Sequence, residues 1–258
     1  MTDVVKLGGS LLENRDLRHA ALEAVATAWS SGKRSIVVHG GGKRIDAMLA
    51  ALDIPKKVQG GLRVTDAETL DVVVSILSGL VNKTLVAELR GRGIRAAGLS
   101  GADGDTLWAE FHEAIEGVDL GFVGRVVRCD PTLLAAVLGA GFLPLVASVA
   151  LGREGTLLNV NADSAASALA GALGAKRLVF LTDVEGVKGA DGAVIDRIDA
   201  RAARTLLASP AVTGGMKPKL RAAVEALEAG VSEVVIAGPS MHRAALLEGK
   251  GGTHLVAA

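Results

Sequence analysis

Residues 4–10 read Val4-Val5-Lys6-Leu7-Gly8-Gly9-Ser10, a short apolar run that ends in a lysine and two glycines. The apolar run is typical of a buried strand, whereas lysine is usually a surface residue. Glycine lets backbone amides come close to a bound anion. In open α/β sheets, ligands lie beyond the carboxyl ends of the strands. The stretch therefore predicts an anion site at the end of the first strand of an α/β fold.

The same order of strand and helix continues along the chain. Apolar, β-branched runs predict strands, and helical spacing between them predicts helices. We expect strands at residues 4–7, 35–39, 95–99, 142–149, 177–181 and 234–236, with an edge strand at 253–256. We expect helices at residues 16–31, 43–52, 67–89, 162–172 and 216–229, another starting at 130–131, and irregular chain with short β pieces at 107–128. This pattern favours a three-layer αβα sandwich with a mostly parallel sheet, shared by two lobes at about 1–175 and 176–258.

Capping residues mark two of these helix starts. Thr65 and Glu68 have the spacing with which a hydroxyl and a carboxylate reciprocally cap the first amides of the helix at 67–89. Asp130 and Pro131 place a cap before a residue whose missing N–H is not needed at that position. Both signals predict where a helix begins.

The composition excludes several classes of protein. The 258 residues include 28 basic and 28 acidic side chains, so the broad positive field typical of nucleic-acid binding is absent. Cys129 is the only cysteine, which excludes an intrachain disulfide and a cysteine-rich metal site. The five histidines lack metal-ligand spacing, no signal peptide is apparent, and polar residues interrupt each apolar stretch before membrane-spanning length. We expect a cytoplasmic protein that binds neither nucleic acid nor membrane and has no dedicated metal site.

Four polar or glycine-rich stretches follow predicted strands. They are Lys6–Ser10, His39–Lys43, Leu158–Asp163 and Thr182–Gly186. Any one of them could be a tight turn that merely tolerates glycine. Three glycine-rich strand ends in one chain favour anion binding instead, because backbone amides and helix dipoles attract negative charge there. Neither the P-loop pattern nor G-x-G-x-x-G is present, so the chain is neither a P-loop protein nor a simple dinucleotide binder.

Five motifs resemble those of the amino acid kinase family, in the same order and spacing over essentially the whole chain. They are Lys6–Gly9, His39–Gly42, Gly61–Thr65, Asn159–Asp163 and Gly215–Lys219. The resemblance implies the fold of that family and transfer of the γ-phosphoryl of ATP to the side-chain carboxylate of N-acetyl-L-glutamate, the second step of arginine biosynthesis. It also implies Mg²⁺ bound with the nucleotide. Such a transfer depends on positioning and charge stabilisation, and an ionised carboxylate needs no general base.

The resemblance also implies a role for each matching residue. Lys6 and Lys219 would contact the transferring phosphoryl group from different lobes, and Asp163 would hold both lysines. Otherwise the lysines would be surface residues and Asp163 a carboxylate at a helix N-terminus. Lys217 lies two residues from Lys219, and the motif alignment selects Lys219. The substrate would be bound by Gly41, Gly42, Arg63 and Asn159, and the nucleotide by Gly8, Gly9, Ser10, Thr182, Asp183, Val184, Gly186, Thr213 and Met216.

Two of the substrate residues have side chains suited to particular groups of the substrate. Arg63 could form a bidentate pair with the α-carboxylate, or only a salt bridge within its loop. Asn159 offers both a donor and an acceptor for the acetamido group.

Two other functions remain open, as does the assembly. A related kinase that acts on carrier-linked or acetylated aminoadipate differs around the arginine, and residues 59–65 look more like the acetylglutamate form. A non-catalytic ligand sensor on this fold would be expected to lack Lys6, Asp163 or Lys219, and all three are present. Arginine-inhibited family members carry an extra N-terminal helix that links dimers into hexamers, for which this chain has no room. We therefore expect a homodimer insensitive to arginine, built partly on the helix at 67–89.

Overall fold

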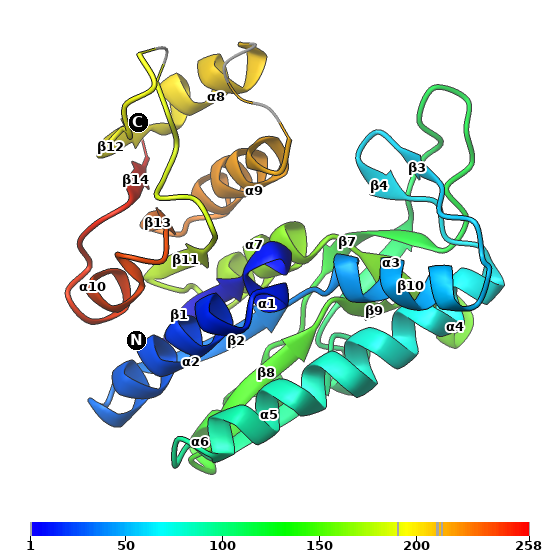
Figure 1. Cartoon of the computed structure of the whole chain (residues 1–258), viewed down its shortest axis with the longest axis horizontal. Helices are drawn as coiled ribbons and strands as arrows, with labels where there is room; N and C mark the ends of the chain where they lie inside the picture. The colour runs from blue at the N-terminus through cyan, green and yellow to red at the C-terminus, as the bar shows by residue number, and fades with distance from the viewer. Residues whose placement is uncertain (1, 190, 210–211, 213, 258) are drawn as a thin grey trace.

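Eight strands form the central sheet: β1 (Thr2–Leu7), β2 (Arg34–His39), β5 (Ala96–Ser100), β8 (Leu143–Ala147), β11 (Arg177–Leu181), β12 (Arg197–Asp199), β13 (Glu233–Ala237) and β14 (Thr253–Val256). The computed structural model describes residues 2–189, 191–209, 212 and 214–257. The strands lie in the order β12-β14-β13-β11-β1-β2-β8-β5, and neighbours are parallel except β13 and β14 (Figure 1). The mostly parallel sheet predicted from the sequence is confirmed.

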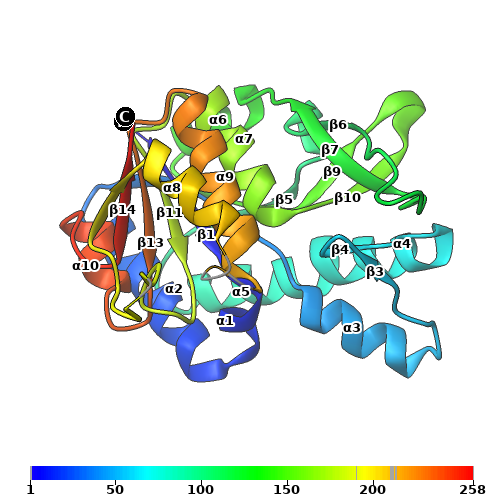
Figure 2. The same ribbon diagram turned by 90° about the horizontal axis from the view of Figure 1, so that it is seen from above.

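Helices cover both faces of this sheet, as Figure 2 shows. Successive strand residues belong to different apolar cores, because Val4 and Ile36 pack on one face while Val5 and Val37 pack on the other. One core includes α2 (Arg15–Ser30), α3 (Gly42–Ala51), α4 (Ala67–Val74), α5 (Asn82–Arg90) and α10 (His242–Leu247), and the other α6 (Thr132–Gly139), α7 (Ala162–Ala172), α8 (Ala200–Ala208) and α9 (Met216–Glu228). The fold is therefore the expected three-layer sandwich, and burial on both faces explains why the strands are continuously apolar.

Strands from the two ends of the chain occupy different halves of the sheet. β11 to β14 lie on one side of β1, and β2, β8 and β5 lie on the other. Lys6 on β1 is in register with Phe180 of β11 and Val38 of β2. The carboxyl ends of these parallel strands therefore meet at one edge, which brings together the motifs that follow them.

Residues 108–160 contribute a small closed barrel that the sequence did not predict. It consists of β6 (Trp108–Phe111), β7 (Val123–Arg128), β9 (Val149–Leu151) and β10 (Leu157–Val160), in the order β10-β7-β6-β9. The single strand expected at 142–149 is divided, because the chain leaves the main sheet after β8 and enters the barrel as β9. The remaining short elements are the β3 (Val58–Gln59) and β4 (Leu62–Arg63) hairpin, helix α1 (Gly9–Glu13), and single turns at Asp103–Asp105 and Arg153–Gly155.

The edge of the sheet differs from the sequence prediction. β14 is not an edge strand, because β12 pairs with it in register from Arg197 opposite His254 to Asp199 opposite Val256. No pattern in the sequence predicted β12, α8 or α10. Three residues of strand carry too little pattern to be recognised before their partner is known.

The cap of the long helix also differs from the prediction. The Asp66 carboxylate accepts a hydrogen bond from the Thr69 amide at 2.9 Å, so Asp66 is the cap. The Thr65 hydroxyl instead donates to the Arg63 carbonyl at 2.8 Å. The capping box is therefore wrong. The start predicted at Asp130 and Pro131 is one residue early, because α6 begins at Thr132 with Pro131 at its N-cap, although the Asp130 carboxylate still accepts from the Thr132 amide at 2.9 Å.

The long helix runs without a break from Ala67 to Gly91 and contains a π-helical segment, η1 (Ser75–Val81). By length and composition it could cross a membrane, contrary to our expectation that polar residues would interrupt every such stretch. The core helix of a soluble protein passes the same test. This helix contacts β5, β8, α2 and α3, and those contacts bury part of its apolar surface.

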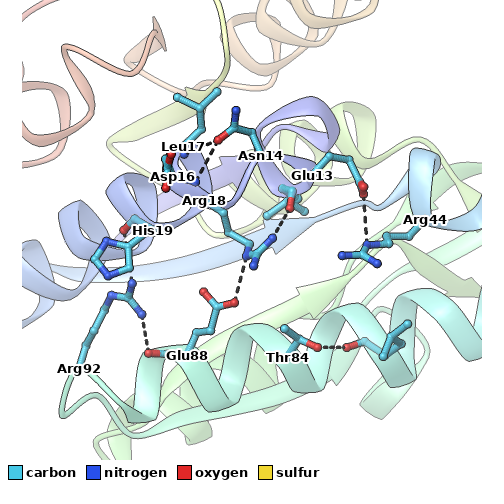
Figure 3. A network of polar contacts seen from close by, with 12 residues as sticks. Glu13, Asn14, Asp16, Leu17, Arg18, His19, Arg44, Thr84, Glu88 and Arg92 are labelled. Carbon is cyan, nitrogen blue, oxygen red and sulfur yellow. Dashed lines mark hydrogen bonds and ion pairs between the residues drawn. The ribbon is translucent and has the colours of Figure 1, made fainter.

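A polar network fixes the short helix α1 that follows the first glycine turn (Figure 3). Arg18 of α2 donates to the Leu12 carbonyl at 2.7 Å and to Glu88 of α5 at 3.0 Å. Glu13 of α1 pairs with Arg44 of α3 at 3.6 Å. Three helices thereby hold α1, and with it the turn that precedes it.

Candidate active site

Lys6, Asp163 and Lys219 meet at the carboxyl edge of the sheet, from β1, α7 and α9. The Lys6 ammonium lies 2.6 Å from Asp163 Oδ1, and the Lys219 ammonium lies 3.4 Å from Oδ2. Asn161 caps α7 by accepting from the Asp163 and Ser164 amides, which places Asp163 in the first helical turn. Asp163 is therefore both a carboxylate in the first turn of a helix and a contact of the two lysines.

Burial and ion pairing act in opposite directions within this cluster. Burial lowers the pKa of the Lys6 ammonium below its ordinary 10.5, and Asp163 opposes that shift. For Asp163, burial alone would raise the pKa, but Lys6 and Lys219 together outweigh burial and hold the pKa below 3.8. An ionised carboxylate between two ammonium groups leaves a net positive charge, which suits an anionic ligand.

The two glycine turns face each other beside this cluster. A Cβ atom on Gly9 would lie 4.0 Å from the Gly42 amide nitrogen. A Cβ on Gly41 would lie 2.9 Å from Leu77 and 3.2 Å from Val81, so the long helix leaves no room for a side chain there. Close packing, rather than backbone conformation, thus favours glycine at position 41, since a φ of 173° is open to any residue.

A cavity of about 220 Å³ adjoins the Lys6–Asp163 pair and includes each of the four predicted substrate residues. Arg63 donates to the Gly42 carbonyl at 3.1 Å and forms an ion pair with Asp46 of α3. Its Nη1 atom is buried and has no hydrogen-bond partner in the described part of the chain. Asn159 donates to the Thr65 hydroxyl at 3.1 Å. Arg63 therefore does form a salt bridge, with Asp46 of α3, and this bridge leaves one side of the Arg63 guanidinium with an unused donor.

A second cavity, of about 460 Å³, lies on the other side of Lys219. Of the predicted nucleotide residues it is lined by Ser10, Thr182, Asp183, Val184, Gly186 and Met216. Gly9 lines the smaller cavity, Gly8 lines neither and donates its amide to the Leu181 carbonyl at 2.9 Å, and Thr213 lies outside the described residues.

Asp183 is the acidic group of the second cavity. Burial would raise its pKa, but hydrogen bonds from Ser10 and Thr182, together with the Lys219 charge, bring the pKa below 3.8. Among the described residues no three His, Cys, Asp or Glu side chains group as a metal site.

Sequence reasoning missed several residues around the two cavities. Val187 and Lys188 line the larger cavity, and Asp46 anchors Arg63. Asp46 follows buried Ile45 on α3, and no motif marks it. Asn82 is a further polar residue of the long helix, and no sequence signal marks its complete burial, because polar Lys83 and Thr84 follow it.

Comparison with known proteins identifies the family. The sequence model of the amino acid kinase family matches residues 1–238. The chain belongs to the amino acid kinase family. An acetylglutamate kinase of Sinorhizobium medicae is 45% identical over 256 residues, which cover 96% of this chain and 87% of that relative. An acetylglutamate kinase of Rhizobium rhizogenes is 43% identical, again over 96% of this chain and 87% of that relative.

Solved structures agree with this membership of the amino acid kinase family. N-acetylglutamate synthase from Neisseria gonorrhoeae, in complex with coenzyme A and N-acetyl-glutamate, matches with a TM-score of 0.85 at 27% identity, over 100% of this chain and 59% of that one. Carbamate kinase from Giardia lamblia matches with a TM-score of 0.72 at 16% identity, over 100% and 98% of the two chains. The latter likeness shows the fold alone.

Proposed function

We propose that this amino acid kinase transfers the γ-phosphoryl of ATP to the side-chain carboxylate of N-acetyl-L-glutamate, the second step of arginine biosynthesis. The observation that carries the proposal is the position of the Lys6–Asp163–Lys219 cluster between two cavities. The smaller cavity would take the acylamino acid and the larger one the nucleotide. The acetylglutamate kinases at 43–45% identity support this choice of substrate.

The cluster has the charge and geometry that the transfer needs. Negative charge on the transferring group is the main obstacle, and prepositioned cations stabilise it without reorganisation. Each lysine has three N–H donors, so contact with Asp163 leaves donors for phosphoryl oxygens. An ionised acceptor carboxylate attacks directly, so no proton need be removed. Mg²⁺ would enter with ATP as part of the nucleotide substrate.

A coupled assay of ADP release over a panel of acylated amino acids tests this function. We expect release with N-acetyl-L-glutamate and little with substrates that lack the side-chain carboxylate. If no ADP is released with N-acetyl-L-glutamate but ADP is released with an aminoadipate derivative, the alternative kinase is established. If no ADP is released with any acceptor, the non-catalytic sensor is favoured.

Arg63 should determine affinity for the acylamino acid. Its unpartnered Nη1 and its place in the smaller cavity support a bidentate pair with the α-carboxylate. Arg63→Lys keeps the charge but loses the planar pair of donors. We expect KM for N-acetyl-L-glutamate to rise about tenfold, a typical loss for one charged hydrogen bond, with KM for ATP unchanged. Equal changes in both KM values would argue against this role.

Two lobes and a homodimer complete the proposal. Residues 176–258 would form the nucleotide lobe, since they line most of the larger cavity, and residues 1–175 the substrate lobe. A cytoplasmic dimer would bury the exposed apolar side chains of Met48 on α3, Leu52 just after α3 and Leu80 on the long helix.

Light scattering tests the dimer. We expect a mass of twice the 26.2 kDa of one chain, and we expect Leu80→Glu to shift the population toward the single chain. A wild-type mass of 26.2 kDa would exclude the dimer.

A further inference from the structure

His39 and Asn82 form a fully buried polar pair beneath the second glycine turn. His39 is the last residue of β2, and its Nδ1 lies 3.0 Å from the Gly40 carbonyl oxygen. Its Nε2 lies 3.0 Å from the amide nitrogen of Asn82, the first residue of α5 after the π-helical segment. Both side chains are 0% exposed, so water cannot replace either contact.

The surroundings of Asn82 determine which of its atoms faces the histidine. Its amide nitrogen also lies 3.0 Å from the Leu145 carbonyl and 3.1 Å from the Leu99 carbonyl, and only a donor can satisfy these oxygens. Its Oδ1 accepts from the Lys83 ammonium at 3.0 Å. The nitrogen of Asn82 therefore faces His39. This nitrogen offers two N–H groups to three acceptors and cannot itself accept a hydrogen bond, so a proton on Nε2 of the imidazole would have no acceptor there, and Nε2 is unprotonated.

This arrangement fixes the tautomer of His39. Since Nε2 is unprotonated, the ring proton is on Nδ1, and Nδ1 donates it to the Gly40 carbonyl. Burial lowers the pKa of His39 to about 4, so the ring is neutral at physiological pH. A neutral ring with one defined donor can hold one carbonyl in one direction.

The Gly40 carbonyl and the Gly41 N–H belong to the same peptide unit. In a trans planar peptide they point in opposite directions, so a carbonyl held toward His39 turns the Gly41 N–H away from it. Gly40, Gly41 and Gly42 all line the smaller cavity. The long helix adds a second restraint, because Leu77 and Val81 pack against Gly41 just before Asn82 in the chain.

We propose that Asn82 and His39 are positioning residues that aim the Gly41 amide at the acylamino-acid substrate. Asn82 sets the His39 tautomer, His39 holds the Gly40 carbonyl, and the rigid peptide presents the Gly41 N–H to the bound anion. The assignment rests on the proposed function for the identity of that substrate. The tautomer and the carbonyl contact are properties of the protein without ligand.

Two isosteric variants test the proposal. The Asn side chain can place a donor near the position of Nδ1, whereas Gln extends its amide toward the position of Nε2. We expect His39→Gln to lower kcat/KM for N-acetyl-L-glutamate by roughly five- to tenfold relative to His39→Asn, the loss typical of one hydrogen bond. KM for ATP should stay within twofold in both. A ratio of at least threefold supports the role, and a smaller ratio overturns it.

A control and a second measurement separate this idea from stability and from the proposed function. His254→Gln makes the same replacement on β14, where His254 pairs with Glu233, and should leave the kinetics unchanged. Nitrogen-15 NMR of the wild-type protein at neutral pH should show His39 protonated at Nδ1 and bare at Nε2. The Nε2-protonated form would overturn the proposal even if no variant folds. Absence of wild-type turnover would count against the proposed function alone, because the NMR result does not depend on substrate.

Discussion

Lys6→Met is expected to lower kcat by roughly a hundredfold or more, the usual effect of removing one group that stabilises transition-state charge. Lys6 lies at the end of β1 in contact with Asp163, and its ammonium borders the cavity assigned to the acylamino acid. Methionine keeps much of the buried volume but offers no cation. Steady-state and single-turnover kinetics of ADP release measure the loss.

Two controls separate catalysis from folding in that experiment. Lys217→Met removes a cation from the exposed side of α9, two residues from Lys219, and should leave kcat unchanged. The double variant Lys6→Met/Asp163→Asn removes both members of the buried pair, so it should be more stable than Lys6→Met yet equally inactive. A kcat for Lys6→Met within a few fold of wild type would remove Lys6 from its proposed role.

Asp163→Asn should cost about 3 kcal/mol of unfolding free energy at neutral pH, the low end for breaking a buried ion pair. The substitution leaves the Lys6 ammonium buried at 4% exposure without its ion-pair partner, while Lys219 is closer to solvent. Turnover should also fall, because neither lysine is then held in place. Urea denaturation compared with wild type gives the free energy.

The pH dependence of that difference provides an independent check. The folded-state pKa of Asp163 lies below the ordinary 3.8, so its contribution to stability is complete above pH 3.8 and is lost as pH falls through the folded pKa. The asparagine variant has no such group. The gap in stability between the two proteins should therefore narrow in acid, and a gap that widens below pH 3.8 would contradict the assignment.

The outline of the fold was predictable because its strands are buried on both faces. Continuous apolar runs such as those at β2 and β11 stand out in the sequence without knowledge of their partners. The barrel was not predictable, since β7 is recognised only through pairing with β10, where Val123 lies opposite Asn159. The choice between Thr65 and Asp66 as a cap also depended on a contact, because either side chain can serve.

Some residues of the candidate site were likewise predictable from the sequence, and others were not. Lys6 stood out because a lysine followed by glycines at a strand end is unusual, and the arrangement of Lys6, Asp163 and Lys219 agrees with the motif alignment. The role proposed for Asn82 could not be inferred, because it depends on carbonyls from two strands distant in sequence. The π-helical turn before Asn82 has no recognised sequence signal, since its hydrogen bonds span only one residue more than those of an α-helix.

The central position of β1 has a consequence for synthesis of the chain. One side of β1 pairs with nearby β2, but the other side pairs with β11, which begins only at residue 177. Until that residue emerges from the ribosome, β1, which contains apolar Val4 and Val5, presents an unpaired edge. Long separations of this kind slow folding and expose edges to other chains. Charged side chains on an exposed strand edge disfavour such pairing, and β1 carries two of them, Asp3 and Lys6.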